Sequence, residues 1–125
     1  MKNVLLIDND TVCNLVNKKR LEQSDLVNAV RVVVNGQDAL KMFTTHFNVV
    51  YQPPDLILLD LDMPVMDGFG FLEGFKKLKF QGKEKIKIVV LSSSQRDEDV
   101  SKAKALGASD FLLKPIGDIE LLGLL

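Results

Sequence analysis

Five short apolar runs, separated by stretches of helical length, constrain the fold of this chain more than any other feature. They are rich in Val, Ile and Leu and do not alternate with polar residues, which is typical of strands buried on both faces of a sheet. The runs are residues 4–7, 29–34, 56–59, 88–91 and 111–113. Because parallel strands need long crossovers, this alternation predicts an α/β fold with a doubly wound parallel sheet and helices on both faces.

The stretches between the runs carry apolar residues at helical spacing, which predicts the side of each helix that faces the sheet. Asp10 is the expected N-cap of the first helix and Gly107 the expected end of the fourth. The last helix begins near Asp118 and has room for only about two turns. The predicted core-facing residues are, helix by helix, Val12, Leu15 and Val16; Leu40, Phe43 and Phe47; Phe71, Leu72, Phe75 and Leu78; Val100, Ala103 and Leu106; and Ile119, Leu122 and Leu125.

Length, charge and composition narrow the function classes. A length of 125 residues with 46% hydrophobic residues predicts one domain over residues 1–125. The 16 Lys and Arg nearly balance the 17 Asp and Glu, which argues against direct nucleic-acid binding, and the lysine-rich segment 76–87 is expected to be solvated surface. No apolar run approaches the roughly 18 residues of a membrane span, no signal-peptide core is present, and the single cysteine fits a reducing compartment. We therefore expect a cytoplasmic protein without membrane contact.

Polar side chains follow four of the predicted strands at the point where each strand ends. In an open doubly wound sheet, ligands bind beyond the carboxyl ends of the strands, so these groups are expected to converge on one basin. They are Asp8 and Asn9 after the first strand, Asp60 and Asp62 after the third, Ser92 after the fourth and Lys114 after the fifth. Each alone is more often a cap or loop residue, but their conjunction at four strand ends favours a functional site.

These groups match the requirements of phosphoryl transfer to a carboxylate. Two anions approach each other only when a cation removes their repulsion. Mg²⁺ prefers oxygen ligands, which the carboxylates of Asp8 and Asp60, the side-chain oxygen of Asn9 and the backbone carbonyl of Asp62 can supply. Lys114 is expected to pair with the charge that develops on the transferred group, and Ser92 to donate a hydrogen bond to one phosphoryl oxygen. The sequence therefore predicts phosphoryl transfer to Asp60.

Four segments of the chain resemble the receiver domains of bacterial response regulators, and the likeness extends over the whole sequence. They are Val-Leu-Leu-Ile-Asp at 4–8, Asp-Leu-Ile-Leu-Leu-Asp-Leu-Asp-Met-Pro at 55–64 followed by Met-Asp-Gly at 66–68, Val-Val-Leu-Ser-Ser at 89–93, and Gly-Ala-Ser-Asp-Phe-Leu-Leu-Lys-Pro at 107–115. The resemblance implies a flavodoxin-like sheet of strand order 2-1-3-4-5.

The resemblance also implies roles for individual residues. The family's phosphoacceptor falls on Asp60, its hydroxyl on Ser92, its lysine on Lys114 and its switch aromatic on Phe111. It further implies a cis Lys114–Pro115 bond, a sensor histidine kinase or phosphotransfer protein as donor, and a downstream protein that the sequence does not name. Such a domain is not an enzyme, although it can slowly lose its own phosphoryl group.

One departure from the family concerns the metal site. Receiver domains usually carry two adjacent acids after the first strand, whereas here Asp8 is followed by Asn9. An amide keeps an oxygen ligand but removes one negative charge, so we expect weaker Mg²⁺ binding than in an Asn9→Asp variant. Asp10 is expected to cap the first helix instead of replacing the missing acid.

The resemblance suggests how phosphorylation would be transmitted. The phosphoryl group adds charge and acceptor oxygens beside Ser92, which we expect to move toward it. Phe111 would then turn into the vacated space and alter the face formed by the fourth helix and fifth strand. Plain core packing is the simpler role for this phenylalanine.

Two alternatives stay open. Leu-Leu-Asp-Leu-Asp at 58–62 resembles the nucleophile and acid pair of haloacid-dehalogenase-type phosphatases, with Asp62 as general acid. In that family, however, the pair follows the first strand of a larger domain. The other alternative is a receiver-like interaction module that does not accept phosphate. Asn9 keeps this alternative open, because it replaces one acid of the family's metal site.

Overall fold

The computed structural model describes residues 1–47, 49–63 and 65–125, so Pro64, at the end of the motif that contains Asp60, lies outside the described residues. The strands are β1 (Lys2–Ile7), β2 (Val27–Val33), β3 (Leu56–Asp60), β4 (Lys87–Ser92) and β5 (Asp110–Leu113). They form a parallel sheet in the order β2-β1-β3-β4-β5. This order confirms the predicted doubly wound fold.

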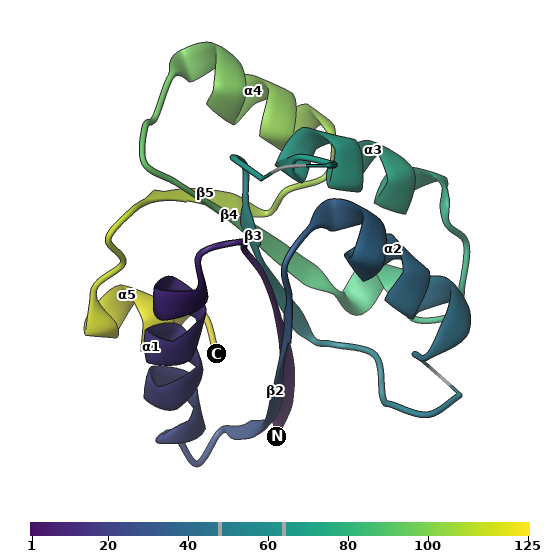
Figure 1. Cartoon of the computed structure of the whole chain (residues 1–125), viewed down its shortest axis with the longest axis vertical. Coiled ribbons are helices and arrows are strands. Elements are labelled where there is room, and N and C mark those ends of the chain that lie inside the picture. The colour runs from purple at the N-terminus through teal and green to yellow at the C-terminus, as the bar shows by residue number, and fades with distance from the viewer. Residues whose placement is uncertain (48, 64) are drawn as a thin grey trace.

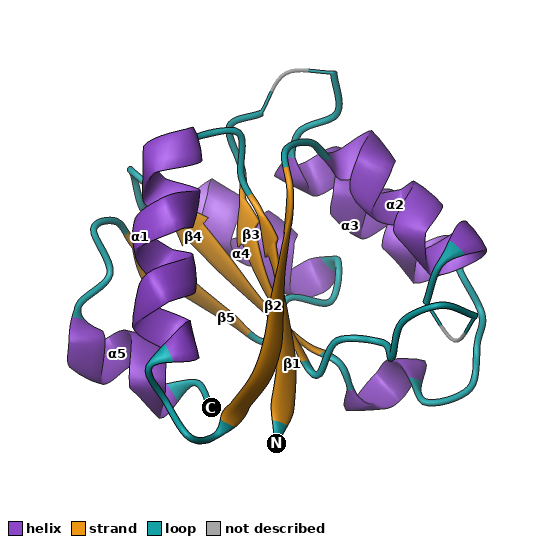
Figure 2. Cartoon of the chain, turned by 60° about the horizontal axis from the view of Figure 1, so that its bottom comes forward, coloured by secondary structure: helices purple, strands orange, loops and turns teal. Residues whose placement is uncertain are grey.

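Within the described residues, five helices cover the sheet from both sides. They are α1 (Thr11–Glu22), α2 (Gly36–Thr45), α3 (Gly68–Lys77), α4 (Asp97–Ala105) and α5 (Asp118–Gly123), with a short 3₁₀ turn, η1, at Lys83–Lys85. Helices α1 and α5 lie side by side on one face, and α2, α3 and α4 lie on the other (Figures 1 and 2). Among the described residues no helix is long and apolar enough to cross a membrane.

The apolar runs of the three central strands, β1, β3 and β4, are buried on both faces as predicted. For the edge strands β2 and β5 the prediction was wrong in part, because Val32 and Leu113 are 38% and 46% exposed. In β1, Leu5 and Ile7 join the apolar cluster under α2, α3 and α4, while Val4 and Leu6 join the cluster under α1 and α5. All four are at most 3% exposed. Successive side chains of a strand point to opposite faces, so a run without polar residues supplies two cores at once.

Helices α2, α3 and α4 pack by the apolar stripes that their sequences predict. Phe71 and Leu72 of α3 and Ala103 of α4 are fully buried. Phe43 of α2 forms the centre of an aromatic cluster, with ring centroids 4.7 Å from Phe47 and 5.0 Å from Phe75. Phe47 itself follows the end of α2 and forms an isolated bridge with Tyr51.

The stripe predicted for α1 is wrong. Val12, Leu15 and Val16 are 70%, 56% and 48% exposed, and the buried residues of this helix are Asn14, Asn17 and Leu21. The reason is polar, because buried hydrogen-bonding groups need partners. The Asn14 amide donates to the carbonyl of Asp8 at 2.7 Å. Arg20, which donates to Asn17 Oδ1 within the helix, also donates to the carbonyl of Ile116 at 2.9 Å.

The stripe predicted for α5 is wrong in part. Ile119 is 91% exposed and Leu122 44% exposed, while Leu121 is fully buried and Leu125 packs partly against the same cluster. A helix of six residues presents little more than one position to the sheet. Asp118 at its start is paired with Arg20 of α1 at 2.7 Å, which orients the helix with Leu121 inward.

Candidate functional site

Three of the predicted site residues meet at the carboxyl edge of the sheet. Asp60 ends β3, Asp8 follows β1, and Lys114 follows β5. The Lys114 ammonium lies 2.8 Å from Asp8 Oδ2 and 3.3 Å from Asp60 Oδ1. Both aspartates are 6% exposed, so the two carboxylates share one ammonium in a largely dry pocket. The Lys114–Pro115 bond that follows is cis, as the resemblance implied.

The first loop and α1 hold Asp8 in place through two hydrogen bonds. Asp8 Oδ1 accepts a hydrogen bond from the backbone N–H of Asp10 at 2.9 Å, and its carbonyl accepts one from Asn14. Asp10 caps α1 as predicted, because its side chain accepts from the N–H of Cys13 at 3.0 Å. The side chain of Asp10 is thereby committed to the helix.

The charges in this pocket perturb one another. Burial and the neighbouring Asp8 carboxylate raise the pKa of Asp60 from 3.8 to about 6, against the opposing effect of Lys114. Burial alone would lower the pKa of Lys114, but its contacts with Asp8 and Asp60 outweigh burial and raise it. Two carboxylates and one ammonium leave a net negative charge, which a divalent cation would relieve.

The remaining predicted ligands lie at the rim of the pocket. Asn9 and Asp62 are both exposed, and the backbone of Asp62 forms a hydrogen bond that stabilises the Asp60 carboxylate. Across the described part of the chain, no group of three or more acidic, histidine or cysteine side chains gathers around one point. If a metal ion binds here, Asp8 and Asp60 could supply two carboxylate ligands, and further oxygen ligands would have to come from backbone carbonyls, the Asn9 amide and water.

The two predicted switch residues lie on the neighbouring strands β4 and β5, where Ser92 is paired with Leu113 and Phe111 with Val90. Ser92 is the last residue of β4 and is 3% exposed; its Oγ accepts from the N–H of Ser94 at 3.3 Å. Phe111 of β5 is 4% exposed and already packs inward with the α2–α4 cluster.

Sequence reasoning missed two residues that support the site. Asn14 holds the carbonyl of Asp8, and Gln95 donates from Nε2 to the Phe111 carbonyl at 3.3 Å, which ties the β4–α4 loop to β5. Asn14, Asn17 and Leu21 do have helical spacing, so a search that accepted asparagine as a core-facing residue would have found Asn14. Nothing in the sequence distinguishes Gln95 from its polar neighbours.

Comparisons with known proteins agree with this geometry. The family model for the response regulator receiver domain matches residues 4–125. A protein-glutamate methylesterase/protein-glutamine glutaminase of Halalkalibacterium halodurans is 36% identical over 118 residues, which cover 94% of this chain and 32% of that protein. This chain spans less than half the length of such curated relatives.

Solved structures give the same answer for the fold. Chemotaxis response regulator CheY4 of Vibrio cholerae is 27% identical, with a TM-score of 0.80 over 99% of this chain and 95% of that one. The Mn²⁺-bound form of response regulator Rcp1 is 25% identical, with a TM-score of 0.77 over 99% of this chain and 88% of that one. The matched region is a receiver domain, which is not itself an enzyme, so the Asp60–Asp62 pair is not that of a dehalogenase-type phosphatase. The chain belongs to the receiver domain family of two-component response regulators.

Proposed function

We propose that Asp60 is the phosphoacceptor and that its donor is a phosphohistidine of a sensor histidine kinase or a phosphotransfer protein. The observation that carries this proposal is the buried Asp60 carboxylate, 3.3 Å from an ammonium that it shares with Asp8. An Asp60 oxygen attacks phosphorus, the phosphorus–nitrogen bond of the donor breaks, and the imidazole nitrogen takes up a proton. With a pKa of about 6, the carboxyl is mostly ionised at pH 7 and therefore nucleophilic.

Lys114 and Ser92 are proposed to bind the transferred group. The ammonium is already directed at Asp60, and the Ser92 hydroxyl ends the neighbouring strand, whose Leu91 is paired with Asp60. Both can donate hydrogen bonds to phosphoryl oxygens, and such bonds are strong because the acceptor oxygens are charged. Slow loss of the phosphoryl group to water would return Asp60 to its carboxylate form.

The basin suits Mg²⁺, whose charge would reduce the repulsion between the Asp60 carboxylate and an incoming phosphoryl group. Asp8 and Asp60 would hold it through carboxylate oxygens, Asp62 through its backbone carbonyl and Asn9 through its amide oxygen. Because Asn9 contributes no charge, an Asn9→Asp variant should bind Mg²⁺ more tightly, by about tenfold at most. Calorimetric titration of both proteins with MgCl₂ measures the difference, and equal affinities would contradict a role for residue 9.

Phosphorylation is tested directly by intact-mass measurement after incubation with acetyl phosphate and Mg²⁺. The wild type should gain one phosphoryl group and Asp60→Asn should gain none. Asp62→Asn is the matched control, since it removes an exposed carboxylate two residues away and should still be phosphorylated. If the wild type stays unmodified, the alternative of a receiver-like interaction module that does not accept phosphate would be favoured. Asn9, in place of the usual second acid, is the feature that suggests this alternative.

We propose that the output is a protein-binding face near α4 and β5. Phosphorylation would shift the protein toward the conformation in which a partner binds this face. Phe111 is buried in this structure, so phosphorylation would hold the inward arrangement by drawing Ser92 toward the phosphoryl group. Amide resonances of α4 and β5 should shift when a phosphoryl mimic binds, and unchanged resonances would rule this switch out. The downstream protein is a partner that recognises this face.

A further inference from the structure

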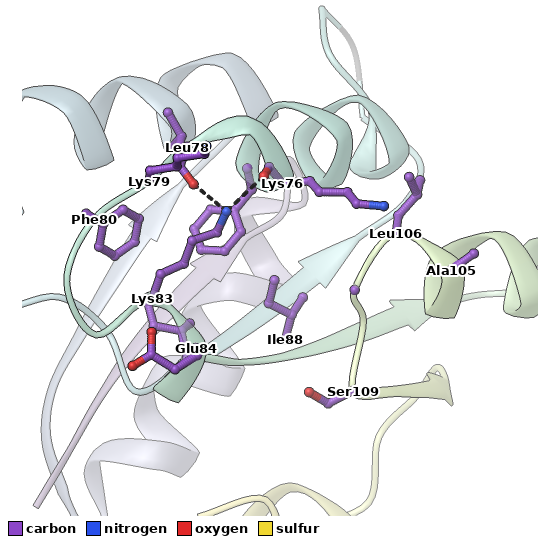
Figure 3. A pocket seen from close by; sticks show the side chains of 13 residues that line it. Lys76, Leu78, Lys79, Phe80, Lys83, Glu84, Ile88, Ala105, Leu106 and Ser109 are labelled. Atoms are coloured by element: carbon purple, nitrogen blue, oxygen red, sulfur yellow. Dashed lines mark hydrogen bonds between the residues drawn. The ribbon is translucent and has the colours of Figure 1, made fainter.

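A hollow of about 630 Å³ lies at the edge of the sheet opposite the Asp60 basin, between the end of α3, η1, the start of β4 and the end of α4 (Figure 3). We call it the lysine groove. Leu78, Ile86 and Leu106, which are only partly buried, supply apolar lining, and Lys76, Lys79 and Glu84 supply charged groups. Its volume falls in the roughly 300–1,000 Å³ range of ligand pockets, in which apolar walls and a few polar groups are typical.

One lysine of the groove has a structural role. The Lys83 ammonium donates hydrogen bonds to the carbonyls of Lys76 and Leu78, drawn as dashed lines in Figure 3, and lies 5.1 Å from the centroid of the Phe75 ring. It therefore satisfies carbonyls at the end of α3 and neutralises that end of the helix dipole. Lys83 holds one wall of the groove in shape.

Two other lysines keep their charge available. Within the described ranges, the ammonium groups of Lys76 and Lys79 take part in no ion pair and no hydrogen bond. Lys76 extends from α3 toward Leu106, so its charge stands beside the apolar lining (Figure 3). The groove thus offers apolar walls next to unpaired positive charge, which suits an apolar group attached to negative charge.

Positive charge continues beyond the groove along the same segment. Residues 76–87 contain six lysines and one glutamate, although the whole chain has a net charge of −1. Lys77, Lys85 and Lys87 belong to this segment but do not line the hollow. A ligand that used all of this charge would have to be longer than the groove, which favours an acidic peptide segment over a small anion.

We propose that the lysine groove binds an acidic peptide segment of a partner protein, which inserts one large apolar side chain between α3 and α4. The apolar side chain contacts Leu78, Ile86 and Leu106, and flanking carboxylates pair with Lys76 and Lys79. Glu84 opposes the binding, because its carboxylate faces the same acidic ligand. The groove lies at the other end of the strands from Asp60, so a partner can occupy it in either phosphorylation state.

The probe is the fluorescein-labelled peptide Asp-Glu-Asp-Phe-Glu-Asp-Glu, titrated with the unphosphorylated protein and followed by fluorescence anisotropy. Two altered peptides separate the contributions: one carries Ser in place of Phe, and the other carries Asn and Gln in place of every acid. Each altered peptide should bind at least about fivefold more weakly than the original peptide. The affinity of the original peptide should fall as the salt concentration rises. Amide shifts on binding should concentrate in residues 75–88 and 105–109.

Charge variants test the protein side of the contact. The double variant Lys76→Ala/Lys79→Ala should bind the acidic peptide about fivefold more weakly, and Glu84→Gln should bind it about twofold more tightly. The matched control Lys18→Ala/Lys19→Ala removes two lysines from α1, on the other face of the sheet, and should leave the affinity unchanged. Asp60→Asn should also bind normally, so failure of the phosphoacceptor proposal would not imitate failure here.

Several results would overturn the proposal. Absence of peptide binding at about 1 mM protein, equal binding of the Ser peptide, or an equal loss in the α1 control variant would each show that the groove does not recognise such a segment. Amide shifts in the groove with ATP but not with the peptide would replace the proposed partner with a small anion.

Discussion

The two faces of the sheet are covered by helices that are held in different ways. Under α2, α3 and α4 the contacts are apolar and aromatic, with Phe71 and Leu72 fully buried. Over the other face, α1 is held by Leu21 together with Asn14 and Asn17, and it leaves Val12, Leu15 and Val16 exposed. The first set of helices packs by apolar side chains, whereas α1 is joined by the Asn14 hydrogen bond to the loop carrying Asp8. One polar contact of α1 therefore supports the functional site.

The largest expected effect lies in the apolar layer. Phe71→Ala should lower the free energy of unfolding by about 3–5 kcal/mol, because it removes a fully buried ring and leaves a cavity. Urea denaturation followed by circular dichroism measures the loss. A loss below about 1 kcal/mol would mean that this face is not held by packing of its large side chains, and the contrast between the faces would disappear.

A smaller loss is expected where the contact is polar. Asn14→Ala should cost about 1–3 kcal/mol, because the buried carbonyl of Asp8 loses its donor. Leu15→Ala, one residue along the helix and 56% exposed, is the control and should change stability by no more than about 0.5 kcal/mol. Equal losses in the two variants of α1 would indicate that the hydrogen bond does not orient the helix.

Ionisation of the buried Asp60 carboxylate should make the folded protein less stable at neutral pH than it would be with this group protonated. Because the pKa of Asp60 rises from 3.8 to about 6 on folding, the folded protein binds this proton more tightly than the unfolded chain, and stability falls as pH rises between these values. At pH 7, Asp60→Asn should therefore be more stable than the wild type by about 1–2 kcal/mol, after allowance for screening by solvent. Below pH 4 most of this difference should vanish.

Thermal unfolding of the wild type and of Asp60→Asn across pH 3–8 measures this difference in stability. Asp62→Asn, which removes an exposed carboxylate two residues away, is the control. Should Asp60→Asn be no more stable than the wild type at pH 7, the electrostatic cost assigned to the pocket would be wrong.

The smallest effect concerns the exposed apolar residues of α1. Val16→Ser should change the free energy of unfolding by no more than about 0.5 kcal/mol, because the side chain is 48% exposed and belongs to neither apolar cluster. The same substitution in a buried valine, Val90→Ser, should cost several times more. A large loss at Val16 would show that α1 packs by its apolar stripe after all, as its sequence alone suggests.

Much of the fold could be predicted because its signals are local or follow from topology. Apolar runs buried on both faces identify the strands, and Asp10 and Gly107 mark helix ends through their own backbone preferences. Asp8, Asp60 and Lys114 could be grouped without coordinates, because the carboxyl ends of parallel strands meet at one edge of the sheet. Those predictions need only the order of the elements and the residue at the end of each.

The orientation of α1 and α5 was decided by tertiary structure. Apolar spacing pointed to Val12, Leu15 and Val16, but the carbonyls of Asp8 and Ile116 lie against another side of α1, where they accept from Asn14 and Arg20. The lysine-rich segment shows the same limit, because its sequence suggests plain solvated surface, whereas Lys83 caps α3 beside a groove. Sequence spacing shows which residues share a helix face, but the buried groups of other segments decide which face turns inward.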